Sequence, residues 1–125
     1  MLRKDLGDII DRICAIGMAF SISTNGTLIF PDLIATIRRR QLMKVSVSLD
    51  GTETFHNELR GRPDAYQQAL EGVRLLSRSG IKTAVAMAIT RDNCRMVEPV
   101  LQAAIECGAA FFVVNQQFAL WPQTT

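Results

Sequence analysis

The chain alternates four times between a stretch with helical periodicity and a short stretch rich in β-forming residues. In the first helical stretch, apolar residues recur at the three-and-four spacing of one helix face, and Gly17 stands where a left-handed cap would end that helix. Such alternation predicts parallel strands joined by right-handed crossovers, with helices covering the sheet. Strands are predicted at 18–23, 43–48, 81–89 and 110–115, and helices from residue 6 to Gly17, from Pro31 through Ile37, from Asp64 to Gly80 and from Val97 to Gly108.

Local signals set several of these boundaries. Pro31 suits the first turn of a helix, and Asp64 is predicted to cap the third helix with its side chain. Pro99 excludes a regular helix through Arg95, because the proline ring would clash with the carbonyl four residues back. The polar stretch 52–63 is predicted to be a loop.

Four parallel strands alternating with four helices define an α/β fold and leave two architectures open. One is a partial (β/α) barrel and the other is a flavodoxin-like open sheet, and periodicity alone does not separate them. In both, chemistry occurs at polar residues just past the carboxyl ends of the strands. Those residues are 23–26, 48–51, 90–93 and 115–117.

Composition excludes several classes of partner. The 125 residues are 48% hydrophobic and 21% charged, which fits one globular domain, and a net charge of +2 is too small to predict a nucleic-acid or membrane-surface partner. No apolar run approaches the roughly 20 residues that span a bilayer. Gly-x-Gly-x-x-Gly and Walker patterns are absent from the sequence, which disfavours binding of nucleotide phosphates. Three widely spaced cysteines and no export signal predict free thiols and a cytoplasmic location.

The strand ends carry motifs that resemble one family. Ser-Thr-Asn-Gly-Thr at 23–27, Val-Ser-Leu-Asp-Gly at 47–51, His56 followed by Leu-Arg-Gly at 59–61, and Ile-Thr-Arg-Asp-Asn at 89–93 occur in order. Together they resemble the radical S-adenosylmethionine (SAM) superfamily, in the branch that modifies peptides and makes peptide-derived cofactors. The resemblance covers residues 1 to 117 and implies a partial barrel, with 118–125 as an irregular tail.

The resemblance implies a SAM site at the mouth of that barrel. Ser48 would contact the methionine moiety of SAM, and Arg60 would bind its carboxylate through a planar guanidinium. Thr24 and Asn25 would face SAM or substrate, and Asp50 would accept a hydrogen bond from a ligand hydroxyl. Gln117 is a further candidate SAM-binding residue, next to Asn115 at the end of the last strand.

Each of these residues also has a structural interpretation. Asn25 with Gly26 is a turn signal, and an Asp-Gly turn needs Asp50 whether or not a ligand binds. Arg60 could form a surface ion pair with Glu58 or Asp64. The histidine, His56, is predicted to be a surface or packing residue and not a catalyst.

The family's chemistry needs a [4Fe–4S] cluster held by a Cys-x-x-x-Cys-x-x-Cys loop, which with SAM yields a 5′-deoxyadenosyl radical. Cys14, Cys94 and Cys107 lack that spacing, so the chain is interpreted as a fragment without its amino-terminal cluster segment, inactive alone. The substrate would be a peptide or small molecule. The alternative is a non-catalytic half-barrel that binds a nucleoside or a partner. Either way, the strand at 18–23 would be an unpaired edge open to self-association.

Overall fold

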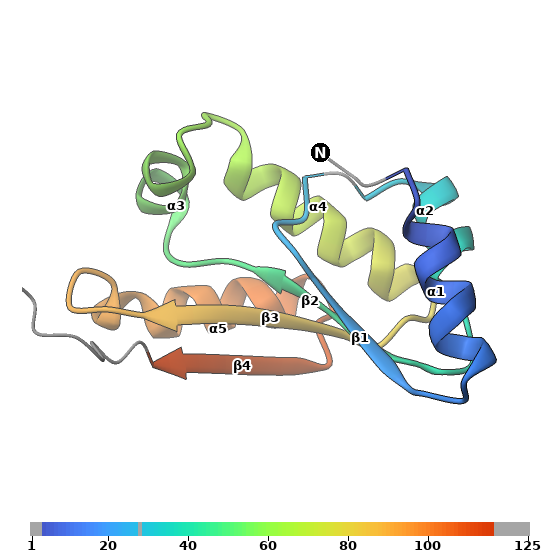
Figure 1. Ribbon diagram of the computed structural model, residues 1–125. Helices are drawn as coiled ribbons and strands as arrows, with labels where there is room; N and C mark the ends of the chain where they lie inside the picture. Colours follow the sequence, from blue (N-terminus) through green and yellow to red (C-terminus); the bar gives the residue numbers. More distant parts are fainter. Residues whose placement is uncertain (1–3, 28, 117–125) are drawn as a thin grey trace, which may run out of the picture.

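The computed structural model describes residues 4–27 and 29–116 (Figure 1). Helices and strands alternate along these ranges, with two helices in succession between the second and third strands. The elements are α1 (Leu6–Ala15), β1 (Phe20–Thr24), α2 (Pro31–Ile37), β2 (Leu42–Ser48), α3 (Glu53–Arg60), α4 (Ala65–Arg78), β3 (Thr83–Ile89), a 3-10 turn (Cys94–Met96), α5 (Val97–Glu106) and β4 (Phe111–Gln116).

The sequence predicts the four strands correctly but one helix too few. Helix α3 occupies most of the stretch 52–63, which was predicted to be a loop, so the described chain has five α-helices and not four. This helix has only eight residues and a largely polar sequence, so it lacks the long apolar stripe from which a helix is predicted. Gly61 ends it in the left-handed conformation at φ 67°.

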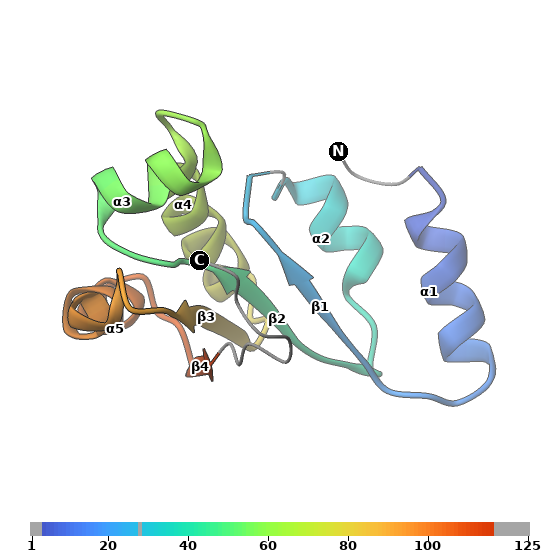
Figure 2. The ribbon, with the colours of Figure 1, turned by 60° about the vertical axis from the view of Figure 1, so that its left-hand side comes forward.

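The order of the strands separates the two architectures. The sheet runs β1-β2-β3-β4, every pair is parallel, and β1 lies at an edge as predicted. A flavodoxin-like sheet would place the first strand between two others and helices on both faces. Here the helices all lie on one side of the sheet (Figure 2), so the fold is an arc of a (β/α) barrel.

The two faces of this arc differ in side-chain size and polarity. On the side facing the helices, Val45, Val47, Val85 and Met87 are at most 1% exposed and form the core with α2, α4 and α5. Alternation along the strands places small and polar side chains on the other side, which we call the open face. The open face carries Ser21 and Ser23 of β1, Lys44, Ser46 and Ser48 of β2, Ala84, Ala86 and Ala88 of β3, and Phe111, Val113 and Asn115 of β4.

Two of the predicted boundary signals have different outcomes. Helix α5 begins at Val97 after the 3-10 turn, which confirms the prediction from Pro99 that no regular helix runs through Arg95. Asp64 occupies the cap position of α4 but makes no side-chain cap hydrogen bond, so that prediction is wrong. Its carboxylate instead accepts from Arg62 and Gln68. None of the helices in the described ranges is long and apolar enough to cross a membrane.

Candidate ligand site at the carboxyl ends of the strands

Asp50, two residues past β2, joins the ends of β2 and β3. Asp50 is 7% exposed. Its carboxylate accepts a hydrogen bond from the Ala88 amide at 2.9 Å through Oδ1 and one from the Arg60 guanidinium at 2.8 Å through Oδ2. Its own amide donates to Nδ1 of His56 at 3.1 Å. Asp50 therefore has the structural role that the Asp-Gly turn predicts, and the contacts extend well beyond that turn.

Asn93 closes the same junction from the loop after β3. This residue is 1% exposed, and its Nδ2 donates to the carbonyl oxygens of Asp50 and Ala88, each at 2.8 Å. Its Oδ1 accepts from the Thr90 amide at 2.7 Å. One amide side chain thus satisfies three backbone groups, one in the loop after β2, one near the end of β3 and one in the loop after β3, which would otherwise be costly to bury.

His56 lies beneath the junction on α3 and is 1% exposed, which agrees with a packing role and not a surface one. Its ring meets Tyr66 edge-on with centroids 6.4 Å apart. Because Nδ1 accepts from the Asp50 amide, the imidazole is neutral in this arrangement. Burial lowers the pKa of His56, and the Arg60 charge lowers it further, while Asp50 acts in the opposite direction. We call Asp50, His56 and Asn93 the β2–β3 latch.

Arg60 ends α3 and pairs with the latch. The sequence suggested Glu58 or Asp64 as a structural ion-pair partner; the structure corrects this, because the partner is Asp50. The Arg60 side chain stays 34% exposed, and a guanidinium carries five N–H donors, of which Asp50 uses one here. The ion pair therefore orients Arg60 and leaves donors for a ligand carboxylate.

Ser48 is the last residue of β2 and lies on the open face beside Ala86 of β3. Ser48 is half-buried, and the residue beside it on β3 carries only a methyl group. Asn115 lies on the same face of β4, in register with Ala88. The open face therefore offers a hydroxyl and an amide, separated by alanines, at the carboxyl end of the sheet.

The end of β1 differs from these positions. Thr24 pairs with the buried Val47, which places it on the helix side and not on the open face with Ser48. Its Oγ1 accepts from the Gly26 amide at 3.1 Å, and Oδ1 of Asn25 accepts from the amide and hydroxyl of Thr27. Both side chains thus form the turn that the sequence predicts. Contact of either with a ligand stays a prediction.

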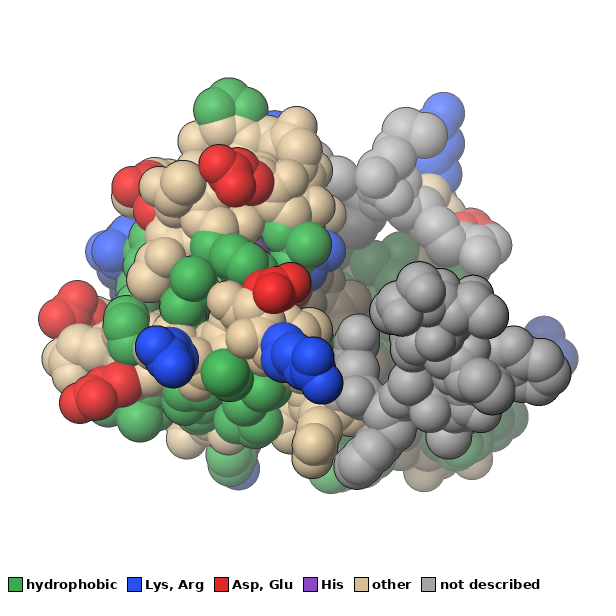
Figure 3. Space-filling model, turned by 90° about the vertical axis from the view of Figure 1, so that its left-hand side faces the viewer, with side chains coloured by type: hydrophobic (Ala, Val, Ile, Leu, Met, Phe, Trp, Pro, Cys, Tyr) green, Lys and Arg blue, Asp and Glu red, His purple; other side chains and the backbone are tan. Residues whose placement is uncertain are grey.

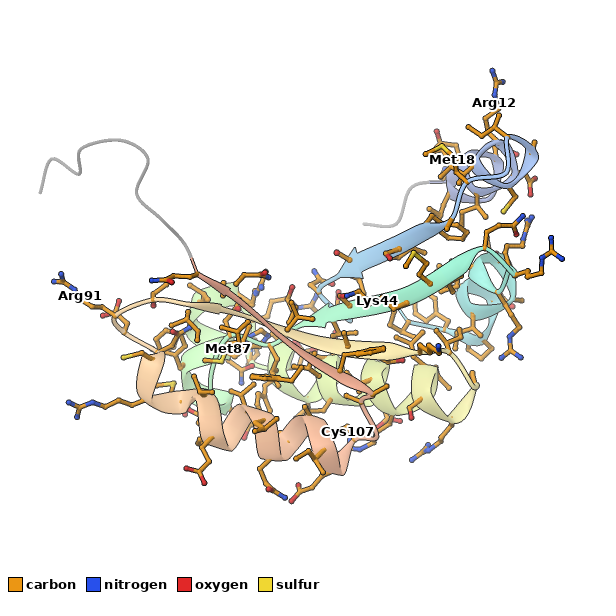
Figure 4. The ribbon with its side chains drawn as sticks, turned by 90° about the horizontal axis from the view of Figure 1, so that it is seen from below. Arg12, Met18, Lys44, Met87, Arg91 and Cys107 are labelled. Atoms are coloured by element: carbon orange, nitrogen blue, oxygen red, sulfur yellow. The ribbon has the colours of Figure 1, made fainter. Side chains whose placement is uncertain are left out.

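The remaining sequence candidates are placed as follows. Gln117 and the 118–125 tail lie outside the described residues, so their roles and the boundary at 117 stay predictions. Cys14 is half-buried in α1, Cys94 is exposed, and burial raises the pKa of Cys107 at the end of α5 (Figure 4). Within the described ranges no three His, Cys, Asp or Glu side chains are grouped to hold a metal. These cysteines therefore do not fit an iron–sulfur cluster.

Sequence reasoning missed the role of Asn93. It lay in the Ile-Thr-Arg-Asp-Asn motif and among the polar residues past the third strand, but no role of its own was predicted for it. The available signal was an asparagine a few residues past a buried strand, where its amide can bond to loop backbone groups. That its partner would be Asp50, 43 residues earlier, was not visible from local sequence.

The donor set suits a small zwitterion more than a polyanion or an extended nucleic acid. Ser48 can donate or accept, Arg60 donates to carboxylates, and Asn115 does both through its amide. Figure 3 shows the side toward which β3 and β4 run, where acidic and basic side chains lie among apolar ones. On the described part of this face neither sign predominates, so recognition there would depend on the individual groups.

Comparison with family models gives one family. A model described as the radical SAM superfamily matches residues 1–104. Among curated proteins, the chain is 32% identical over 111 residues to an AdoMet-dependent heme synthase of Oleidesulfovibrio alaskensis, covering 88% of the chain and 29% of that protein. It is 29% identical over 116 residues to the antilisterial bacteriocin subtilosin biosynthesis protein AlbA of Bacillus subtilis, covering 91% of the chain and 26% of that protein. The chain spans about three tenths of the curated relatives it matches.

Solved structures show the same fold. The crystal structure of Streptococcus suis SuiB bound to S-adenosylmethionine aligns with a TM-score of 0.77 at 17% identity, covering 97% of the chain and 28% of SuiB. SuiB bound to its precursor peptide SuiA aligns with a TM-score of 0.74 at 16% identity, covering 90% of the chain and 26% of SuiB. The arc thus aligns with about a quarter of SuiB.

Proposed function

Because the chain belongs to the radical SAM superfamily, we propose that its open face binds the methionine end of S-adenosylmethionine at the carboxyl ends of β2 to β4. One observation supports this most: Asp50 ties the Arg60 guanidinium to the end of β2, two residues from the open-face hydroxyl of Ser48. A guanidinium and a hydroxyl suit the carboxylate and ammonium groups of an amino acid.

The residues present fit the methionine end of SAM in their chemistry, whereas the described cysteines do not fit the iron–sulfur cluster. When SAM and a [4Fe–4S] cluster meet in this family, they supply a 5′-deoxyadenosyl radical; this part of the chain contributes binding and orientation. The β2–β3 latch holds the backbone next to Ser48, so the hydroxyl would be placed before the ligand arrives.

The substrate of the complete enzyme would be a peptide or a small molecule. The relatives' names include both kinds, since one is a heme synthase and another serves subtilosin biosynthesis. The SuiB neighbour is bound to a precursor peptide. Specificity would depend largely on segments beyond this arc, because the chain covers about three tenths of those proteins.

Nuclear magnetic resonance titration of the iron-free 125-residue chain tests the site. Adding SAM should shift amide resonances at 46–50, 86–90 and 113–116, and leave those of α1 unchanged. Methionine alone should reproduce the shifts around Ser48, whereas adenosine alone should not, because the proposed groups recognise the zwitterion. Shifts confined to α1, or none at millimolar SAM, would refute the proposal.

Two pairs of variants sharpen the titration. Ser48→Ala should weaken SAM binding, while Ser21→Ala, which changes the same residue type at the other end of the open face, should not. Arg60→Gln should weaken binding of SAM, while Arg78→Gln at the exposed end of α4 should not. We expect a loss of about tenfold for each site variant, the size of one charge-assisted hydrogen bond.

The second candidate is a half-barrel that binds a nucleoside or partner without chemistry. The observation that favours it is the poor fit of the described cysteines to a cluster. SAM binding by the iron-free chain is compatible with both candidates. Reconstitution with iron and sulfide distinguishes the two candidates. A catalytic fragment needs the cluster segment supplied as a separate chain, whereas a binding module holds its ligand equally well without that segment.

A further inference from the structure

Helix α3 holds Asp50 at two points, through side chains that are one helical turn apart. His56 and Arg60 occupy positions i and i+4 of α3, so they lie on the same face of the helix. Nδ1 of His56 accepts a hydrogen bond from the Asp50 amide at 3.1 Å, and the Arg60 guanidinium donates one to the Asp50 carboxylate at 2.8 Å. Because α3 lies beyond the carboxyl end of β2 (Figure 1), these contacts hold both the backbone and the side chain of Asp50, two residues from Ser48.

The helix itself is held from two sides at His56. Phe55 packs on the turn after β2, because a Cβ on Gly51 would lie 2.5 Å from Cδ1 of Phe55. On the other side, Oδ1 of Asn57 accepts a hydrogen bond from the Tyr66 amide at 2.7 Å, which connects α3 to the start of α4. The ring of His56 lies between these two contacts, with the Tyr66 ring edge-on to it. The acceptor atom of His56 therefore has a fixed place beside the turn.

The surroundings of the imidazole favour its neutral form. The ionisable groups brought to it by the described contacts are Arg60 of its own helix, Asp50 after β2 and Tyr66 of α4. Burial raises the pKa of Tyr66, so the phenol is uncharged near neutral pH. A protonated imidazole has no lone pair to offer the Asp50 amide, and it would place a second cation beside Arg60.

We infer that His56 is a positioning residue for SAM: its neutral imidazole holds the Asp50 amide and so keeps the Asp50 carboxylate where it orients Arg60 toward the ligand. This inference rests on the proposed binding of SAM by Ser48 and Arg60. His56 is 1% exposed, so it acts through Asp50 and not by touching the ligand. Protonation of His56 removes the acceptor, and SAM affinity should therefore fall as the imidazole becomes charged.

Asparagine and leucine at position 56 test the inference because these two side chains match in shape. Oδ1 of asparagine, like Nδ1 of histidine, lies two bonds from Cβ and accepts a hydrogen bond, whereas leucine has a methyl group there. In the amide titration at pH 7, His56→Asn should bind SAM within about threefold of wild type, and His56→Leu should bind about tenfold more weakly. A packing role alone predicts the reverse order, because leucine suits an apolar contact with Tyr66 better.

A double-mutant cycle tests whether His56 acts through Arg60. Once Arg60→Gln has removed the guanidinium, adding His56→Leu should lower SAM affinity by less than about threefold, because the group that it helps to orient is already absent. An undiminished tenfold loss in the Arg60→Gln chain would overturn the inference.

A measurement on the unaltered chain needs no substitution. His56 is the single histidine of the sequence, so its ring resonance can be followed from pH 7 to pH 5. SAM stays a zwitterion over this range, because α-carboxyl and α-amino groups titrate near about 3.5 and about 7.8. Coupling between proton and ligand is reciprocal, so saturating SAM should lower the titration midpoint of the ring by about one pH unit for a tenfold difference in affinity. Only the pH range in which circular dichroism stays native enters the comparison.

The outcomes distinguish this inference from the proposed function. Absence of SAM binding by the unaltered chain would overturn both. If SAM binds, the inference alone fails when folded His56→Leu binds as tightly as wild type or more tightly than His56→Asn. An unchanged midpoint of the His56 ring at saturating SAM would also overturn it. Should His56→Leu unfold, which circular dichroism would reveal, the ring titration of the unaltered chain decides.

Discussion

Two neighbouring parts of the same sheet end are held by different forces. At the ends of β2 and β3, buried polar side chains of the latch form hydrogen bonds between residues that are 38 and 43 positions apart in the sequence. At the end of β1, the side-chain hydrogen bonds of Thr24 and Asn25 reach only two residues along the chain. The connection from β1 to the helices must therefore come from packing.

That packing depends on the absence of a side chain at Gly26. A Cβ there would lie 2.7 Å from Cγ1 of Val47 and 2.9 Å from Cα of Ala69, and the residue has φ +82°. Gly72 meets the same place from α4, because a Cβ on it would lie 2.9 Å from the Gly26 carbonyl oxygen. The packing at the end of β1 thus leaves no space for an added atom. The β2–β3 latch instead requires that each hydrogen-bond partner is present and that His56 is neutral.

Gly26→Ala should produce the largest loss of stability. The left-handed conformation costs a non-glycine residue about 1–2 kcal/mol, and overpacking adds about 1–3 kcal/mol. We expect the free energy of unfolding in urea to fall by about 2–5 kcal/mol. Gly17→Ala is the matched control, because Gly17 has φ +78° but nothing lies within 4 Å of its added Cβ. Equal losses for the two variants would contradict steric packing at β1.

Asn93→Ala should give the next largest loss. The change removes three hydrogen bonds and leaves the buried carbonyls of Asp50 and Ala88 and the amide of Thr90 without that partner. We expect a loss of about 2–4 kcal/mol in urea unfolding. The exposed Gln102→Ala change on α5 should cost less than about 0.5 kcal/mol. If Asn93→Ala costs no more than Gln102→Ala, the latch does not fix the loops.

The contrast between these two sheet ends also shows what the sequence can predict. Hydrophobic periodicity and glycines after helices are local signals, and Gly80 and Gly108 do take left-handed conformations at helix ends. Period-two alternation likewise puts Ser48 and Val47 on opposite faces of β2. The alternation of helices and strands and the alternation of faces along β2 could therefore be predicted, whereas the choice of a partial barrel over an open sheet required the order of the strands.

The candidate site was harder to predict because its contacts join distant loops. Nothing near Arg60 in the sequence distinguishes Asp50 from Glu58 or Asp64 as its partner; α3 decides, and α3 is a short polar helix that periodicity missed. The side on which Thr24 lies depends on the register between β1 and β2, which includes an irregularity at 20–21. The sequence shows which residue types are present near the strand ends. Which residues they contact could be known only from the fold.

The latch should also make stability depend on pH, unlike the β1 end. Its His56 must be neutral to accept from the Asp50 amide, and its pKa is lowered on folding, chiefly by burial. Below about pH 6.5, the usual histidine pKa, the unfolded chain therefore binds more protons than the folded chain. The stability that neutral His56 contributes is complete above that pH and is lost as the pH falls toward the folded-state pKa.

Urea unfolding between pH 8 and pH 5 measures this effect. The free energy of unfolding should fall with decreasing pH by up to about 1.4 kcal/mol per pH unit below pH 6.5, the limit for one proton. His56→Gln keeps a side-chain acceptor but cannot titrate, so its curve should be flatter than the wild-type curve over this range. Gly17→Ala should keep the wild-type slope. Parallel curves for wild type and His56→Gln would exclude His56 as the source.

Asn25→Ala should give the smallest loss of stability and separates turn from ligand site. The lost hydrogen bonds to Thr27 are exposed and span two residues, so we expect the free energy of unfolding to fall by only about 0.5 kcal/mol. Asn25→Asp keeps the acceptor and should restore that loss. If Asn25 also contacts SAM, as the resemblance implied, then Asn25→Ala should lower SAM affinity in the amide titration while changing stability little. Affinity equal to wild type would leave Asn25 as a turn residue alone and confine recognition to the β2–β4 end of the open face, where the latch supplies the rigidity.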